Sequence, residues 1–215
     1  VFSIIMVEAI IFDFDMTLVN SLEVGNKSLD ELRKKHGLEF DLSEKEIWST
    51  PHVKLMKRIS DLNDNRYSWE EISQWNKNSM FKNYGNCVVN SRDVLKSLSN
   101  KGISFSVISN NSRNVLESVL NKNGNSDIKF EDVLGNEDFQ ENKTKKEAIE
   151  LIVKKHSFHK DEVWYVGDSV SDMEAAVSAG VIPIGVSTGL HTREELENSG
   201  ARIVLESLKG LERYV

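Results

Sequence analysis

Short apolar runs alternate with amphipathic helical patterns from about residue 86 to the end of the chain. An earlier apolar run, 9–12, belongs to the same set. The other apolar runs lie at 103–108, 132–134, 163–166, 181–186 and 202–205, and the helical patterns at 91–100, 112–122, 144–156, 172–179, from 192 and from 207. Such alternation is typical of a parallel sheet with helices on both faces. The pattern therefore predicts an α/β fold.

Residues 20–85 show a different pattern, in which Trp, Asn, Lys and Glu accumulate at helical spacing. Two segments, 43–46 and 68–71, have the Ser-x-x-Glu form of a capping box, which marks the start of a helix. An apolar stripe that includes Trp69 and Ile72 is typical of a helix packed into a core. We therefore expect a helical domain at 20–85. It would be inserted into an α/β domain made of 1–19 and 86–215.

Two carboxylates follow the first apolar run, at Asp13 and Asp15. If one strand carried both residues, their side chains would share a face because strand side chains alternate. Like charges at that distance raise the pKa of one carboxyl group, unless a cation compensates. A solvated turn, with Thr17 as a turn or cap residue, is the alternative. We interpret the pair as a metal or acid–base site.

Polar residues also follow two other apolar runs, as Ser109 with Asn110 and as Asp168 with Asp172. The carboxyl ends of parallel strands meet at one edge of the sheet, and ligands bind there in open α/β folds. Ordinary roles exist for Ser109, as a turn residue, and for Asp172, which would complement a helix dipole. Convergence of these residues with Asp13 is nevertheless the main expectation.

In order and spacing, these groups resemble the motifs of the haloacid dehalogenase-like phosphohydrolases. The resemblance is to the branch with a helical cap after the first motif, which includes phosphoglycolate phosphatase and β-phosphoglucomutase. The matching segments are 13–21, 109–111, Lys143 and 167–172. The resemblance covers the whole α/β part and implies a Rossmann-like parallel sheet with an inserted α-helical cap domain.

The chain departs from the family pattern at two positions. Met16 stands where the family usually has glycine, which affects the turn that enters the cap. Thr144 replaces the proline that commonly follows the motif lysine, so Lys145 or Lys146 is an alternative to Lys143 as the functional lysine. The separation between the lysine and the last motif favours Lys143.

The resemblance implies a Mg²⁺-dependent phosphatase that hydrolyses a small phosphorylated metabolite, such as phosphoglycolate or a sugar phosphate. Asp13 would be the nucleophile that becomes an aspartyl phosphate, and Asp15 the general acid and base. The implied ligands of Mg²⁺ are Asp13, Asp15 through its carbonyl, and Asp168, with Asp172 in support. The implied phosphate contacts are Thr17, Ser109, Asn110 and Lys143.

By the same resemblance, His52 and Lys54 occupy the place of the family's substrate loop, where they would contact a second anionic group. A solvated loop is the alternative for this segment. Two other functions stay open: a phosphomutase of the β-phosphoglucomutase type, and a non-catalytic phosphate-binding regulatory module. The intact set of acids argues against the module.

The amino-acid composition excludes several classes of binding partner. The net charge of −7 argues against a nucleic-acid or anionic-membrane surface, because those surfaces need clustered Lys and Arg. The single cysteine, Cys87, excludes an internal disulfide and a multi-cysteine zinc site, and favours a reducing compartment. Residues 1–6 are apolar but resemble neither a signal peptide nor a membrane span. We expect a cytoplasmic monomer or weak homodimer.

Overall fold

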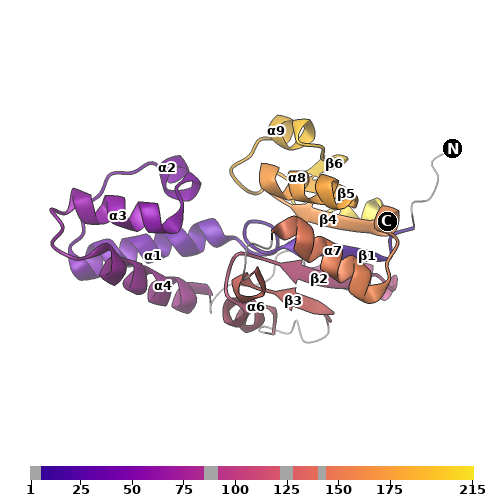
Figure 1. Cartoon of the computed structure of the whole chain (residues 1–215), viewed down its shortest axis with the longest axis horizontal. Helices are drawn as coiled ribbons and strands as arrows, with labels where there is room; N and C mark the ends of the chain where they lie inside the picture. The colour runs from indigo at the N-terminus through magenta and orange to yellow at the C-terminus, as the bar shows by residue number, and fades with distance from the viewer. Residues whose placement is uncertain (1–5, 85–91, 122–127, 140–143) are drawn as a thin grey trace. The chain divides into compact units, whose positions relative to one another are not determined.

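The structure is a computed structural model that describes residues 6–84, 92–121, 128–139 and 144–215 (Figure 1). The chain forms two compact units. Unit 1 comprises Val1–Asn20 and Val88–Val215, and unit 2 comprises Ser21–Cys87. Their roles as catalytic core and cap stay predictions.

Unit 1 is built on a six-stranded sheet in the order β3-β2-β1-β4-β5-β6, and every pair of neighbouring strands is parallel. The strands are β1 (Ala9–Asp13), β2 (Ser104–Ile108), β3 (Asp132–Leu134), β4 (Val163–Gly167), β5 (Ile182–Val186) and β6 (Ile203–Leu205). The predicted α/β fold is therefore confirmed. Strand β1 lies between β2 and β4, so the polar residues after β1, β2 and β4 follow three adjacent strands at the same edge of the sheet.

The helices of unit 1 are α5 (Arg92–Asn100), α6 (Arg113–Leu120), α7 (Lys145–His156), α8 (Val170–Ala179) and α9 (Arg193–Asn198), with 3-10 helices η2 (Asn136–Phe139), η3 (Lys160–Glu162) and η4 (Leu211–Arg213). The expected helix from residue 207 is wrong, because only the short η4 forms there. Gly210, with φ of 91°, begins it in a left-handed conformation that a continuous α-helix does not contain.

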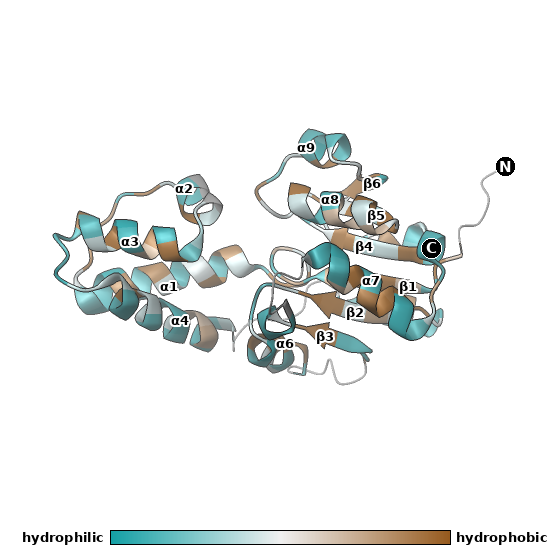
Figure 2. Ribbon diagram, in the orientation of Figure 1, coloured by the Kyte–Doolittle hydropathy of each residue, from teal (hydrophilic) through white to brown (hydrophobic). Residues whose placement is uncertain are grey.

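One face of the sheet packs against α7 and α8. Ala9 and Ile11 of β1 form a buried cluster with apolar residues of both helices and with Val163 and Tyr165 of β4. Figure 2 shows how strongly apolar β1, β2 and β4 are. Because strand side chains alternate, Asp13 shares the face of Ala9 and Ile11, which is the face that these two helices cover.

Unit 2 contains α1 (Ser21–His36), α2 (Glu44–Ser49), α3 (His52–Leu62) and α4 (Trp69–Tyr84). Its core is a cluster of aliphatic side chains that includes Leu32, Met56 and Ile72, with Trp69 and Trp75 packed against it. The predicted capping box at the start of α2 is present, with Ser43 and Glu46 bonded to each other's backbone. No helix in the described parts of the chain is long and apolar enough to cross a membrane.

Candidate active site

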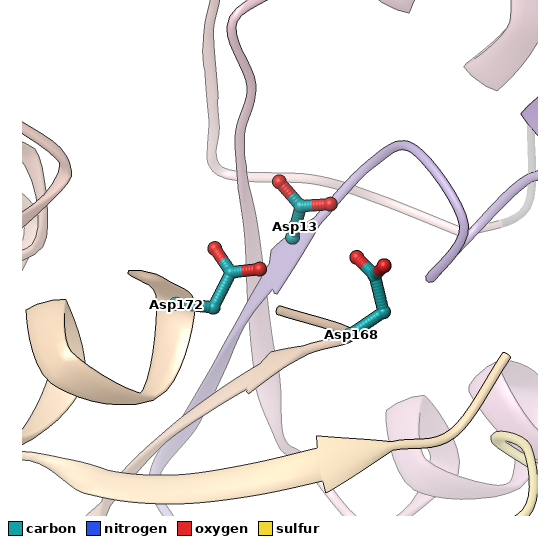
Figure 3. A group of neighbouring side chains, drawn as sticks. All are labelled: Asp13, Asp168 and Asp172. Carbon is teal, nitrogen blue, oxygen red and sulfur yellow. The ribbon is translucent and has the colours of Figure 1, made fainter. Parts of the chain in front are cut away.

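Three aspartates meet at the carboxyl end of the sheet. Asp13 ends β1, Asp168 directly follows β4, and Asp172 lies in the first turn of α8. One carboxylate oxygen from each lies within 4.8 Å of the others, and Figure 3 shows the three groups around one space. Asp13 and Asp172 are buried, and Asp168 is partly buried. Such a set of oxygen donors suits a hard divalent cation such as Mg²⁺.

Lys145 is the lysine that the structure brings to these acids. Its Nζ donates to Asp13 Oδ1 at 2.7 Å and to Asp172 Oδ1 at 2.6 Å. Thr144, in the place of the family's proline, is the N-cap of α7 and forms a capping box with Glu147, so that Lys145 is the first helical residue. Lys146 instead pairs with Glu150 at 3.5 Å. Lys143 lies outside the described residues, so its predicted role stays a prediction.

Hydrogen bonds engage both oxygens of the Asp172 carboxylate. Oδ2 accepts from the Ser169 hydroxyl at 2.5 Å and from the Ser169 backbone N–H at 3.2 Å, while Oδ1 accepts from the Tyr165 hydroxyl at 3.2 Å as well as from Lys145. A Cβ on Gly167 would lie 2.6 Å from the Asp172 Cβ, so glycine permits this close packing. Since its oxygens are already bound, Asp172 is better suited to orient Lys145 than to bind a metal ion.

Asp15 belongs to a second part of the site. Its Oδ2 accepts from Asn111 Nδ2 at 2.6 Å and from the Ser109 hydroxyl at 3.3 Å, both in the turn after β2. The expectation that one strand carries both carboxylates is wrong, because β1 ends at Asp13. Met16 has φ of 60°, a left-handed conformation that ends the extended chain. Asp15 therefore faces the loop after β2, while Asp13 contacts Lys145.

Thr17 carries a buried hydroxyl for which the described residues offer no hydrogen-bond partner. Leaving such a group unpaired costs about 1–3 kcal/mol. The predicted contact of Thr17 with phosphate stays a prediction. Asn110, predicted beside Ser109, is an exposed residue of the turn after β2.

The three acids carry more negative charge than Lys145 neutralises, and among the described residues Lys145 is the lysine that contacts them. Burial raises the pKa of Asp13 well above its ordinary value, although Lys145 opposes the shift. Burial and the neighbouring Asp172 raise the pKa of Asp168 to about 7. Burial lowers the pKa of Lys145, but Asp13 and Asp172 outweigh it and raise the value overall. A divalent cation among these oxygens would favour the ionised carboxylates, so the residues present fit Mg²⁺.

His52 and Lys54 lie in unit 2, in the first turn of α3. The His52 ring nitrogen Nε2 is 3.0 Å from the Ser73 hydroxyl of α4, and burial together with Lys77 lowers the pKa of His52. Lys54 is exposed. Their contact with a substrate stays a prediction.

A family model supports these motifs. The model for the haloacid dehalogenase-like hydrolases matches residues 10–186, which span both units. The chain belongs to this family.

Individual proteins are similar to the chain over part or most of its length. Phosphoglycolate phosphatase of Vibrio vulnificus is 32% identical over 120 residues, which are 56% of this chain and 52% of that protein. The chain thus spans about half the length of this relative. Phosphoglycolate phosphatase of Synechococcus elongatus is 26% identical over 199 residues, 88% of each chain. Among solved structures, CbbY of Rhodobacter sphaeroides in complex with phosphate has a TM-score of 0.73 at 20% identity and covers 96% of each chain, which shows a shared fold.

The sequence analysis assigned no role to two residues of this hydrolase site. Asn111 belongs to the matching segment 109–111, directly after Ser109 and Asn110, and a second amide in the same turn was the available signal. Tyr165 is a fully buried residue of β4, and the signal was a hydroxyl-bearing side chain within an otherwise apolar run. The hydrogen bond from Tyr165 to Asp172 depends on how the start of α8 packs against β4, which sequence spacing alone does not reveal.

Replacing Asp168 with asparagine is expected to stabilise the metal-free protein at neutral and alkaline pH. The pKa of Asp168 rises from 3.8 to about 7 on folding, so its contribution to stability is fully present below about pH 4 and is lost as the pH rises through about 7. The variant should therefore melt several degrees higher than wild type at about pH 8, but equally at about pH 4.

Melting curves in a chelator test this expectation for Asp168. Added Mg²⁺ should raise the melting temperature of the wild-type protein at about pH 8 and have little effect on the variant. If the variant melts at a lower temperature than wild type at about pH 8, or if their difference in melting temperature does not depend on pH, the raised pKa of Asp168 is contradicted.

Proposed function

We propose that this hydrolase is a Mg²⁺-dependent phosphatase that hydrolyses a small phosphorylated metabolite through an aspartyl phosphate on Asp13. The observation that carries the proposal is the bond from Lys145 Nζ to the buried Asp13 carboxylate, beside Asp168 and Asp172. The two relatives described above are named phosphoglycolate phosphatases, which supports phosphoglycolate or a sugar phosphate as the substrate class.

Asp13 is the proposed nucleophile. Lys145 binds Asp13 Oδ1, which leaves Oδ2 to attack phosphorus. The bond from Oδ2 to phosphorus forms while the bond from phosphorus to the ester oxygen breaks, and the enzyme retains the phosphoryl group as an acyl phosphate. Lys145 lowers the pKa of Asp13 and so favours the ionised, attacking form, against burial and the neighbouring acids, which together raise the pKa.

Asp15 is the proposed proton carrier. It would donate a proton to the leaving alcohol oxygen and then accept one from the water that attacks phosphorus and releases Asp13. Bonds from Asn111 and Ser109 hold its carboxylate in one orientation. This arrangement favours phosphoryl transfer, which needs an acid for the leaving group.

The proposed ligands of Mg²⁺ are the Asp13 carboxylate, the Asp15 carbonyl and Asp168, and the bound ion would neutralise charge on the phosphoryl group. Thr17, whose hydroxyl finds no hydrogen-bond partner among the described residues, and Ser109 would bind phosphate oxygens, together with the Asn110 backbone N–H. His52 and Lys54 would contact a second anionic group of the substrate. The cluster of Asp13, Asp168 and Asp172 supports the proposed metal site.

A panel of phosphate monoesters tests the proposal. The panel contains phosphoglycolate and several sugar phosphates, each assayed for inorganic phosphate release with Mg²⁺ and with a chelator. We expect Mg²⁺-dependent hydrolysis of at least one small ester. Absence of such hydrolysis across the panel would overturn the proposal in favour of a non-catalytic phosphate-binding module. Phosphorus NMR that shows isomerisation of a sugar phosphate without release of phosphate would overturn it in favour of a mutase.

A further inference from the structure

The loop that follows β5 joins two elements that fix both of its ends. At its start, the Ser187 backbone N–H and hydroxyl donate to the Leu205 carbonyl of β6 at 2.8 and 3.2 Å. At its end, Thr192 is the N-cap of α9 and forms a capping box with Glu195. Residues 188–191 lie between these two ends, in unit 1 with the acids.

Thr188 contacts the turn that carries Asp15. Its Oγ1 donates a hydrogen bond to the backbone carbonyl of Met16. Met16 is a buried residue with φ of 60°, a conformation that glycine adopts readily and that is unfavourable for residues with a Cβ. The Met16 carbonyl belongs to the peptide that follows Met16, so the Thr188 hydroxyl holds the backbone of this turn one residue beyond Asp15.

Gly189 contacts Asp168. A Cβ built on Gly189 would lie 1.8 Å from Asp168 Oδ2 and 2.7 Å from Asp168 Cγ, which is far closer than non-bonded atoms approach. The loop backbone therefore lies directly against the carboxylate, and glycine is required there for Asp168 to keep its present position. Any larger residue at 189 would push the carboxylate away from Asp13 and Asp172, or displace the loop.

We propose that residues 188 and 189 form a positioning clamp for the active site, an inference that rests on the proposed function. Thr188 acts through the Met16 carbonyl on Asp15, the proposed proton carrier. Gly189 acts through packing on Asp168, a proposed metal ligand. Neither residue touches the reacting atoms. The loop thus adds a fourth segment to the three strand ends that the sequence motifs identify.

The role of Thr188 in the clamp is tested by comparing Thr188→Val with Thr188→Ser. Valine keeps the shape of the side chain but removes the donor, so kcat should fall about 10- to 100-fold while KM changes less than about threefold. Serine keeps the donor and should restore kcat to within about threefold of wild type. An unchanged kcat in the valine variant, or no recovery with serine, would overturn the role of the hydroxyl.

A double-mutant cycle with Met16→Gly tests whether Thr188 acts through Met16. Glycine takes up the left-handed conformation without strain, so the Thr188→Val change should cost at least about fivefold less in kcat when residue 16 is glycine. Additive effects would contradict the coupling. Thr192→Val is the matched control, because it removes the cap of α9 at the far end of the same loop. It should lower the melting temperature by a few degrees without changing kcat.

The Gly189 arm is tested by direct metal binding as well as by turnover. Gly189→Ala should weaken Mg²⁺ or Mn²⁺ binding, measured by calorimetry on the protein alone, by at least about tenfold. Unchanged binding would overturn this arm. If Gly189→Ala fails to fold, the Thr188 variants decide the proposal.

Turnover of the wild-type protein is measured before that of the Thr188 and Gly189 variants, so that failure of the proposed function can be told apart from failure of the clamp. Its absence across the ester panel would overturn the proposed function, and calorimetry on the Gly189→Ala variant would then still test the clamp. Normal wild-type turnover together with unaffected Thr188 and Gly189 variants would overturn the clamp and leave the proposed function standing.

Discussion

Replacing Asp13 with asparagine is expected to lower the turnover of a phosphate monoester by at least about 10³-fold. Asparagine keeps the size and the hydrogen-bonding oxygen of the side chain but lacks the anionic oxygen that forms the bond to phosphorus. The fold should persist, because the change removes a buried charge whose pKa is already raised by burial. Steady-state kinetics with saturating Mg²⁺, together with circular dichroism of the variant, measures both expectations.

Asp132→Asn is the matched control for this change. Asp132 is also a strand aspartate with a mostly buried side chain, and it pairs with Lys155 and His156 at the start of β3, which β2 separates from β1. Its replacement should lower stability by about 1–3 kcal/mol and leave turnover within about twofold of wild type. Near-normal turnover of Asp13→Asn would refute the nucleophile assignment.

Replacing Lys145 with methionine is expected to lower kcat by about 10²- to 10³-fold. The ammonium group lies between Asp13 and Asp172, so its loss leaves two buried carboxylates without their cation. Asp13 would then be protonated more readily, which removes the nucleophile, and the transferring phosphoryl group would lose a positive charge. The loss of kcat should therefore become smaller as the pH rises.

Two other lysine variants serve as controls for Lys145. Lys146→Met, which loses only a surface pair with Glu150, should keep kcat within about twofold of wild type, since such pairs contribute little. Lys143→Met tests the lysine that the family spacing favours. A large loss with Lys143→Met and none with Lys145→Met would contradict the geometry and restore the first assignment.

The fold was predictable because its strands are short, apolar and rich in β-branched residues. Each of β1, β2 and β4 also stops at polar side chains, so the alternation of elements located the carboxyl edge of the sheet. The convergence of Asp13, Asp168 and Asp172 follows from that edge. The pattern failed after residue 207, where the helical pattern indicated an α-helix but Gly210 is left-handed and only a short 3-10 helix follows it.

The contact of Lys145 with the acids was predictable in principle. Thr144 and Glu147 have the spacing of a capping box, which fixes the start of α7 and makes Lys145 its first residue. Family spacing pointed instead to Lys143. The local helix signal was thus more informative about side-chain placement than the distance along the chain to Asp168.

Contacts between distant segments were beyond sequence reasoning. The bond from Thr188 to Met16 and the packing of Gly189 on Asp168 depend on how the loop after β5 meets two other strand ends. No periodicity or motif in 187–191 encodes that contact. The split between Asp13 and Asp15 was equally hidden, since it depends on the left-handed backbone of Met16.

Chemical trapping of the phosphorylated residue tests the central claim most directly. The protein is quenched with acid during turnover and treated with borohydride, which reduces an acyl phosphate to an alcohol, and the peptides are then sequenced by mass spectrometry. Conversion of Asp13 to homoserine, only in the presence of substrate and Mg²⁺, is the predicted result. Homoserine at Asp15 or Asp168, or no conversion while phosphate is being released, would contradict the account.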